Sequence, residues 1–405
     1  MSSYVFKEKI INNYAYIILT SLTLFFLLMK ASYGEEEYSV SNLPYFIYFI
    51  QNFALFGALL SLFLLLIITV FLKQNKIRFS ISLIIFWFLL TWYFFRSYLV
   101  GSGDIYNVFA ILVVFALFIC ASSINREDNL SVKNNFLLPL IISLSSWSVL
   151  NYTLFLMGYG YNLIEGSSRF FGTTSHPNTC GAYAVISFIL FFWGCLKNNK
   201  KKEYKKIFLF GILTFISLNL IFIAGSRSGM LAVMLGLLTI MPIYLWIIPL
   251  FFSFIIYIIY VMRIFPESMI FVAFDRMKEA PLNNRDEVWL ALISDFQKYP
   301  ILGAGDLSGV SGNGFLTALG GTGFLGGTLF LILAIFMICK IFMNKLFIGY
   351  HKMKDYIVLS NVLMIVIFSL SIFEGFIFDK FGFLQVLTFF IFALIGPFNS
   401  RSKYI

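Results

Sequence analysis

The chain has 405 residues, of which 60% are hydrophobic, 20% aromatic and only 12% charged. This composition excludes an ordinary water-soluble domain and is typical of a chain whose surroundings are mostly lipid. The formal net charge of +10 raises the question of nucleic acid, but the basic residues lie between apolar runs. There they indicate membrane topology and attraction to anionic lipid headgroups, so we expect no nucleic acid partner.

Apolar runs follow one another along the whole chain. A hydrocarbon core about 30 Å thick needs roughly 20 apolar residues per helix, and charged or Gly- and Pro-bearing breaks leave about twelve such runs. The sequence therefore predicts an all-α, polytopic membrane protein, with a single integral membrane domain over residues 1–405. The first run lacks a small-residue cleavage site, so we expect it to stay as an anchor. The predicted spans are 14–32, 45–72, 79–95, 105–124, 136–157, 181–196, 207–224, 228–241, 243–262, 312–339, 356–373 and 383–397.

One stretch, from Met230 to Met262, is consistent either with a single tilted helix or with two helices joined at Met241-Pro242. Parity favours two helices. An even number of segments between Lys206 and Lys340 keeps both of the adjoining basic loops on one side of the membrane.

The basic residues also set the orientation. If the N-terminus with Lys7 and Lys9 is cytoplasmic, every lysine-rich loop is cytoplasmic too. The cytoplasmic segments then hold 19 Lys and Arg against 5 Asp and Glu, whereas the outer segments hold 10 against 14. We therefore expect a multi-pass protein with both termini in the cytoplasm.

Two larger loops are predicted on the outer, periplasmic side, at 158–179 and 263–311. The second contains an expected amphipathic helix, 284–299, at the membrane surface, and a glycine-dense stretch follows it. That stretch suits a flexible re-entry with close helix packing and a substrate-lining role equally well. The apolar positions of the expected helix are Val288, Leu292, Ile293 and Phe296.

Arginine and lysine are distributed differently across the membrane. Six of nine arginines fall outside, against four of twenty lysines. Topology alone does not favour arginine there, but a permanently charged, planar guanidinium matches two phosphate oxygens. The outer arginines are Arg96, Arg169, Arg227, Arg263, Arg276 and Arg285.

Two of these arginines lie in short motifs. Arg227 stands in the turn 225–229 between two apolar runs, and a charge at mid-bilayer costs about 2.5 to 3.5 kcal/mol, so it faces either a cavity or lipid headgroups. Arg169 opens a segment in which Gly172 and Pro177 predict an ordered turn before a helix. Asn178 or Thr179 is the expected N-cap, and the helix N-terminus would favour an anion.

His176, in the same segment, is the only outer histidine. A neutral imidazole can take a proton from a sugar hydroxyl, which makes His176 a candidate catalytic base. The alternative is a turn histidine that hydrogen-bonds nearby backbone.

Several short motifs follow one another in order over residues 165–330. They are Phe171-Gly172 with His176-Pro177-Asn178, the Gly225–Gly229 turn, Arg285 through Trp289, Pro300 through Gly305, Asn313 through Leu316, and Gly323 through Gly326. Together these motifs resemble the bacterial O-antigen polymerase and ligase family. The resemblance implies a metal-independent, inverting glycosyltransferase without a cofactor, acting at the periplasmic face of the inner membrane. Its implied partners are oligosaccharides and polysaccharides linked to undecaprenyl diphosphate, membrane lipid and a chain-length regulator protein.

By motif position, the resemblance implies that Arg169, Arg227 and Arg285 bind the lipid diphosphate, and we place Asn178 with them. His176, Arg227 and Arg285 are the candidate catalytic residues. Gly312-Asn313 stands where ligases of this family carry a His-Asn pair, which favours a polymerase over a ligase. The base then stays open among His176, Asp286, Glu287, Asp306, Glu374 and Asp379.

We therefore expect a surface-polysaccharide polymerase. The alternatives are an O-antigen ligase and a flippase or transporter, because twelve helices with both ends inside is also a carrier layout. No half-to-half repeat is evident in the sequence, which counts against a carrier. A membrane acyltransferase, which needs a histidine-centred site, is the third class.

Overall fold

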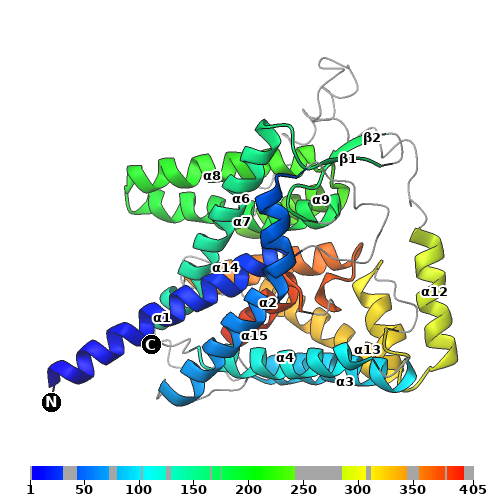
Figure 1. Cartoon of the computed structure of the whole chain (residues 1–405). Helices are drawn as coiled ribbons and strands as arrows, with labels where there is room; N and C mark the ends of the chain where they lie inside the picture. Colours follow the sequence, from blue (N-terminus) through cyan, green and yellow to red (C-terminus); the bar gives the residue numbers. More distant parts are fainter. Residues whose placement is uncertain are drawn as a thin grey trace.

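The computed structural model describes residues 2–30, 43–72, 80–101, 104–124, 129–164, 167–174, 176–241, 285–306, 312–343, 355–378 and 381–395. Within these residues the fold is almost entirely helical, as predicted, with one β-hairpin that the all-α expectation missed (Figure 1). Each predicted span coincides with a helix except 243–262, which lies outside the described residues.

The helices have the following bounds. The first half of the chain forms α1 (Ser2–Met29), α2 (Tyr45–Ile67, continued by a π-helical turn at Ile68–Leu72), α3 (Ile81–Val100), α4 (Ile105–Ser122), the short α5 (Asn129–Val132) with a π-helical turn at Lys133–Leu137, and α6 (Leu138–Leu156). The second half forms α7 (Pro177–Lys200), α8 (Tyr204–Ile223), α9 (Arg227–Ile240), α12 (Arg285–Lys298), α13 (Gly314–Met343), α14 (Asp355–Ser371), a 3₁₀ turn at Phe376–Phe378 and α15 (Phe383–Ile395).

Seven of the described helices are long and apolar enough to cross a membrane, judged by length and composition. These helices indicate a multi-pass membrane protein, while the count of about twelve spans stays a prediction. Four shorter apolar helices accompany them: Tyr14–Met29, Arg227–Ile240, Asp355–Ser371 and Phe383–Ile395.

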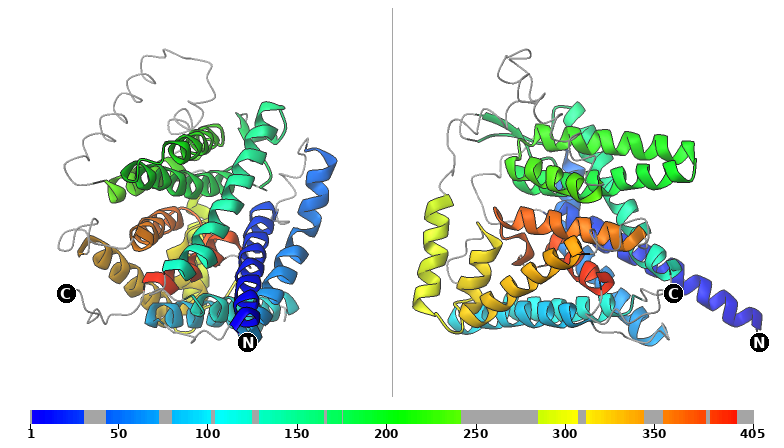
Figure 2. Two further views of the ribbon diagram at one scale, coloured as in Figure 1. Left: turned by 90° about the vertical axis from the view of Figure 1, so that its left-hand side faces the viewer. Right: turned by 180° about the vertical axis from the view of Figure 1, so that it is seen from behind.

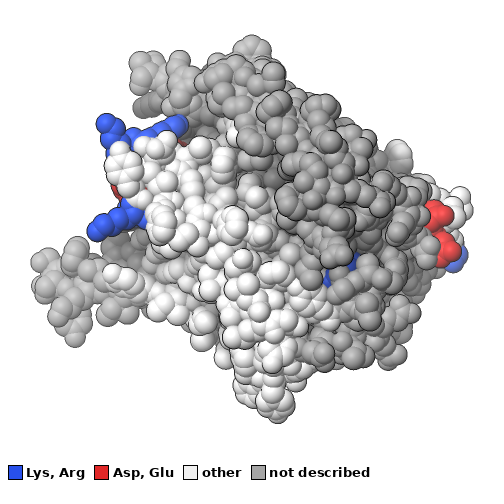
Figure 3. Space-filling model, turned by 90° about the horizontal axis from the view of Figure 1, so that it is seen from above, with Lys and Arg blue, Asp and Glu red and all other residues white. Residues whose placement is uncertain are grey.

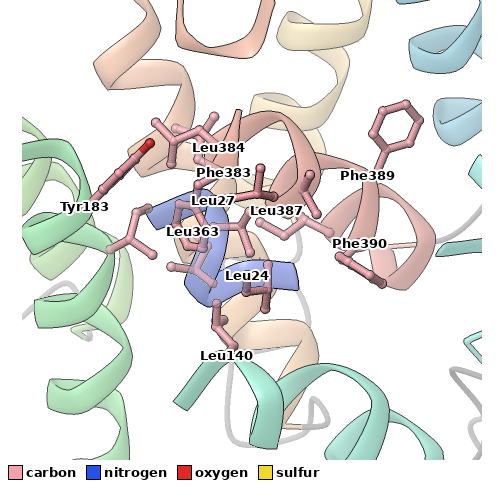
Figure 4. Packing of buried hydrophobic residues seen from close by; sticks show 14 of the residues in the cluster. Leu24, Leu27, Leu140, Tyr183, Leu363, Phe383, Leu384, Leu387, Phe389 and Phe390 are labelled. Carbon is pink, nitrogen blue, oxygen red and sulfur yellow. The ribbon is translucent and has the colours of Figure 1, made fainter. Parts of the chain in front are cut away.

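The centre of the molecule is built around α15, which is buried along nearly its whole length. Side chains from α1, α6, α7 and α14 lie in one apolar cluster with those of α15 (Figure 4), and the ring of Tyr183 on α7 packs edge-on against Phe383 with centroids 5.1 Å apart. A helix that is apolar on all sides is a buried helix. Over these residues protein rather than lipid surrounds α15.

Polar contacts group the helix ends as the charge pattern predicts. Lys197 Nζ near the end of α7 lies 3.1 Å from Asp355 Oδ2 at the start of α14, both on the predicted inner side. Lys30 Nζ after α1 donates to Phe381 O at 3.5 Å, both on the predicted outer side. Figure 3 shows basic side chains gathered where α7 and α8 meet, and acidic ones at the opposite end, where α12 lies. Which of these two ends faces the cytoplasm stays a prediction.

The expected surface helix is present as α12. It lies across the direction of α3, α4, α7 and α8 (Figures 1 and 2) and packs against α13. Leu292 is buried and Ile293 is 38% exposed, so the buried face is narrower than the sequence predicts. An orientation across the membrane-crossing helices suits a helix at the membrane surface.

Within residues 300–306 and 312–327, the glycine-dense stretch after α12 is joined by backbone hydrogen bonds. Helix α13 is interrupted at Gly323, whose φ is 69°, a value that glycine adopts without strain. Around this break, Ala304 N donates to Gly320 O at 2.8 Å and Phe324 N donates to Pro300 O at 2.7 Å. These bonds replace those lost from the helix, which a membrane protein must supply internally.

Arg96 has a structural place in this arrangement. Its Nε donates to Gly303 O at 2.9 Å and its guanidinium lies 5.8 Å from the centre of the Tyr299 ring. Arg96 thus holds the docked segment and lies outside the motifs that carry Arg169 and Arg227.

The arrangement of the helix ends predicts that cysteines introduced at the two ends of the molecule are labelled from opposite sides of the membrane. With the four native cysteines replaced by serine, Lys201→Cys at the end of α7 and Tyr159→Cys after α6 should react with a membrane-impermeant maleimide from opposite sides of a sealed vesicle. Both positions are exposed. Labelling of both variants from the same side would contradict this arrangement.

Candidate functional site

A small β-hairpin carries Arg169 into the protein. Strand β1 (Tyr161–Ile164) pairs antiparallel with β2 (Ser167–Phe170), and Asn162 lies opposite Arg169. From the sequence, only a loop is predicted over 158–179. The local signal for a hairpin was Glu165-Gly166 between two short segments, but SSRF holds a single strong β-former, Phe170.

The turn after the hairpin is fixed by polar side chains from two helices. Thr173 Oγ1 accepts from Trp147 Nε1 at 3.1 Å and from Asn151 Nδ2 at 3.0 Å, both on α6. Asn151 Oδ1 accepts from Thr173 N at 2.8 Å, and Gln51 Nε2 on α2 donates to Thr173 O at 2.7 Å. Sequence reasoning missed Gln51, Trp147 and Asn151, although an amide within an apolar run was a usable signal.

His176 ends this turn and caps α7. Its Nδ1 accepts from Asn178 N at 3.0 Å, so the expectation that Asn178 or Thr179 is the N-cap was wrong. The reason is Pro177, which lacks an N–H and suits the first helical position, so the cap precedes it. A neutral imidazole that accepts at Nδ1 carries its proton on Nε2. This is the backbone-bonded histidine weighed above, and a role as base stays a prediction.

Arg169 is buried, at 2% exposure, among oxygen atoms. Its Nε and Nη2 donate to Ala224 O at 3.2 and 2.9 Å, and Nη2 also lies 3.3 Å from Gly225 O. A buried charge is stable only when it is hydrogen-bonded or paired. These bonds join the hairpin to the turn before α9, which is 55 residues away in the chain.

Asn178 extends this arrangement to a carboxylate. Its Oδ1 accepts from Arg169 Nη2 at 3.1 Å, and its Nδ2 donates to Glu374 Oε1 at 2.8 Å. The amide presents its carbonyl to the cation and its NH₂ group to the anion, which fixes the amide orientation. One of the six candidate bases therefore lies in the same hydrogen-bonded chain as Arg169.

Arg227 begins α9 directly after this clamped turn. Ser226 is the N-cap, and its Oγ accepts from Gly229 N at 3.1 Å. A Cβ atom on Gly181, the fifth residue of α7, would collide with the Ser226 side chain, so the N-terminal parts of α7 and α9 lie together. Two adjacent helix N-termini beside two arginines favour an anion. We call Arg169, Asn178, Arg227 and Glu374 the outer cluster, because all four lie on the side predicted to face outward.

Arg285 opens α12, and its side chain lies outside the described part of the chain. The start of α12 is connected to the outer cluster through α13. A Cβ on Gly312 would collide with Val288 in the first turn of α12. Asn313 caps α13 and donates from Nδ2 to Ile372 O at 2.7 Å, two residues before Glu374.

The other candidate bases have different places. Asp286 and Glu287 are exposed in the first turn of α12, and Asp306 is docked on α3 by a bond from its backbone N to Ser97 Oγ at 2.8 Å. Asp379 lies outside the described residues, as do Arg263 and Arg276.

Two chemical properties of the site follow from its surroundings. Burial raises the pKa of Tyr161 in β1 to about 12, so its phenol stays protonated at neutral pH and is not a base. Among the described residues, no group of three or more His, Cys, Asp or Glu side chains is arranged to hold a metal ion.

The chain matches no family model, no curated protein and no solved structure.

The anchored turn predicts the effect of removing one hydroxyl. Thr173→Val leaves the Trp147 indole N–H without its acceptor, which should cost about 1 to 3 kcal/mol and lower the melting temperature of the purified protein. Thr153→Val is the matched control, because the Thr153 hydroxyl is exposed and bonds only within its own helix, to Val149 O at 2.9 Å. Equal melting temperatures for the two variants would contradict the anchoring role.

The contact between α7 and α9 predicts a second effect. Gly181→Ala should push the start of α9 away at a cost of about 1 to 3 kcal/mol, because a Cβ there meets Ser226. Hydrogen–deuterium exchange over residues 224–230 should then become faster. Gly211→Ala on α8 is the control, since nothing lies within 4 Å of a Cβ built there. Unchanged exchange in Gly181→Ala would argue against the close approach.

Proposed function

We propose that this protein is an O-antigen or related surface-polysaccharide polymerase. It transfers a growing glycan from undecaprenyl diphosphate to a lipid-linked repeat unit at the periplasmic face of the inner membrane. The observation that carries the proposal is the clamp between Arg169 and the carbonyls of Ala224 and Gly225. It brings together two motifs, each with an outer arginine, beside a pair of helix N-termini.

Arg227 is the residue that we assign to the diphosphate. It is partly exposed at the first position of α9, and the N–H groups of that first turn are oriented with it. As the bond between sugar and diphosphate breaks, negative charge develops on the departing oxygen. A fixed guanidinium and a helix N-terminus stabilise that charge without having to reorganise.

Arg169 and Asn178 position this group. The Nε and Nη2 donors of Arg169 are committed to protein oxygens, and its side chain is buried. Its charge raises the positive potential at the site, while its hydrogen bonds fix the turn that presents Arg227. Direct binding of phosphate by Arg169 or by Arg285 stays a prediction.

The arrangement of the whole chain suits a lipid-linked donor. The outer cluster lies at the ends of apolar helices, so an isoprenoid tail can lie in the bilayer while its diphosphate reaches Arg227. The cluster and the Lys197–Asp355 pair lie at opposite ends of α7. The basic inner end then sets the orientation, and the outer end carries the chemistry.

The polymerase, the ligase and the flippase act on the same lipid-linked glycan with different outcomes. A polymerase extends the lipid-linked glycan and gives a ladder of products, whereas a ligase moves the glycan to a different acceptor. A flippase moves the lipid across the membrane without any new glycosidic bond. Purified protein in proteoliposomes with a lipid-diphosphate-linked repeat unit should give the ladder. Transport of the lipid without a ladder would overturn the proposal.

Arg227→Ala should reduce ladder formation by at least roughly 100-fold, because one oxyanion-stabilising donor contributes about 10² to 10³ in rate. Arg227→Lys keeps the charge but loses the planar fork, so we expect an intermediate rate. Lys298→Ala, at the exposed end of α12, is the control for loss of an outer positive charge. Wild-type rates in Arg227→Ala, with the protein inserted normally, would remove Arg227 from the site.

A further inference from the structure

Glu374 follows α14 at the same end of the molecule as Arg227. Helix α14 runs opposite to α7, since Asp355 at its start pairs with Lys197 near the end of α7. Helix α9 packs along α14, and a Cβ on Gly236 would lie 3.0 Å from Val366 Cγ2. From that contact, a rise of about 1.5 Å per residue places Arg227 roughly 13 Å further along α9. The same rise places the end of α14 roughly 8 Å further, one turn before Glu374. The two side chains therefore start at similar depth on neighbouring helix ends.

The position of Glu374 is fixed from two sides. Its Oε1 accepts from Asn178 Nδ2 at 2.8 Å. Its backbone O lies 3.5 Å from a Cβ built on Gly314, at the start of α13. Phe373 and Glu374 also donate their backbone N–H groups to Leu370 O at 3.1 Å, so the chain turns tightly here. A carboxylate on such a scaffold is held in place without being buried among apolar side chains.

The charged side chains near Glu374 suit the two substrates of the proposed reaction, an anionic diphosphate donor and an acceptor with a hydroxyl group. Arg227 begins α9, the helix beside α14, and Arg169 is linked to Glu374 through the Asn178 amide, so both positive charges belong to the same end of the molecule as Glu374. Glu374 is an acceptor-only group when ionised and can take a proton from a hydroxyl. The other described outer carboxylates have separate places, such as Asp104, which caps α4 by accepting from Tyr106 N at 3.0 Å.

We infer that Glu374 is the general base that activates the acceptor hydroxyl, an inference that rests on the proposed function. The acceptor oxygen forms a bond to the anomeric carbon of the donor while its proton passes to the Glu374 carboxylate. The bond between that carbon and the diphosphate oxygen breaks, and its electron pair leaves on the diphosphate beside Arg227. Glu374 then releases the proton to water.

Glu374→Gln is the variant that separates a base from a structural residue. The glutamine Oε1 can still accept the hydrogen bond from Asn178, so the scaffold is kept while the basic oxygen is lost. The rate of transfer to a sugar hydroxyl should fall by about 10² to 10⁴, the range that a general base contributes. Glu374→Asp keeps a carboxylate and should retain more activity than Glu374→Gln.

Azide gives a second readout that a structural role would not produce. Azide is an anionic nucleophile that needs no deprotonation, so Glu374→Gln with azide should release glycan from the lipid diphosphate as a glycosyl azide. Arg227→Ala should lose both reactions, because the leaving group is no longer stabilised. A Glu374→Gln protein that builds the ladder at the wild-type rate would overturn the inference, as would one that fails with azide as well. If the wild-type protein makes no ladder from its cognate substrate, the proposed function itself has failed.

Discussion

The buried guanidinium of Arg169 is the constraint on which one end of this structure depends, the end where α7 and α9 begin. A permanently charged group at 2% exposure must be surrounded by acceptors, and Arg169 obtains them from the carbonyls of Ala224 and Gly225 and from Asn178. The turn before α9 and the start of α7 are therefore held together. Replacing the arginine with an apolar residue would leave those acceptors without a donor.

Where the regular hydrogen bonds of a helix are interrupted, groups from elsewhere in the chain bond to the backbone instead. The turn after β2 is bonded to Gln51 and Asn151, and the break at Gly323 in α13 is bonded to the segment that follows α12. In a membrane protein, non-helical backbone is tolerated only where protein or water satisfies it. In the described residues of these two irregular segments, backbone groups are hydrogen-bonded in this way, which positions the side chains they carry.

The helices could be predicted from the sequence, because apolar runs of sufficient length have few alternatives in lipid. Arg227 could also be singled out, since a charge between two apolar runs calls for an explanation. The hairpin around Arg169 was missed, because its strands are four residues each and give a weak pattern. The link from Asn178 to Glu374 spans 196 residues, and nothing in local sequence pairs these two side chains. Pro177 suits the first position of a helix, so it predicts an N-cap at residue 176. The residue-type preference for Asn and Thr at N-caps pointed instead to Asn178 or Thr179.

The sequence alone assigns phosphate binding to both Arg169 and Arg227, whereas their different burial in the outer cluster suggests two different roles. Arg169 and Arg227 both have the chemistry to bind phosphate, but only Arg227 stands partly exposed at a helix N-terminus. In the proposed function, burial rather than residue type is what assigns Arg169 to positioning and Arg227 to phosphate binding.

The central claim is that the start of α9 is the lipid diphosphate site. The most direct test is an experimental structure of the protein in a nanodisc with undecaprenyl diphosphate. The account predicts phosphate density against Arg227 and the first turn of α9. Density at Arg96, or at the basic end where α7 and α8 meet, would contradict it.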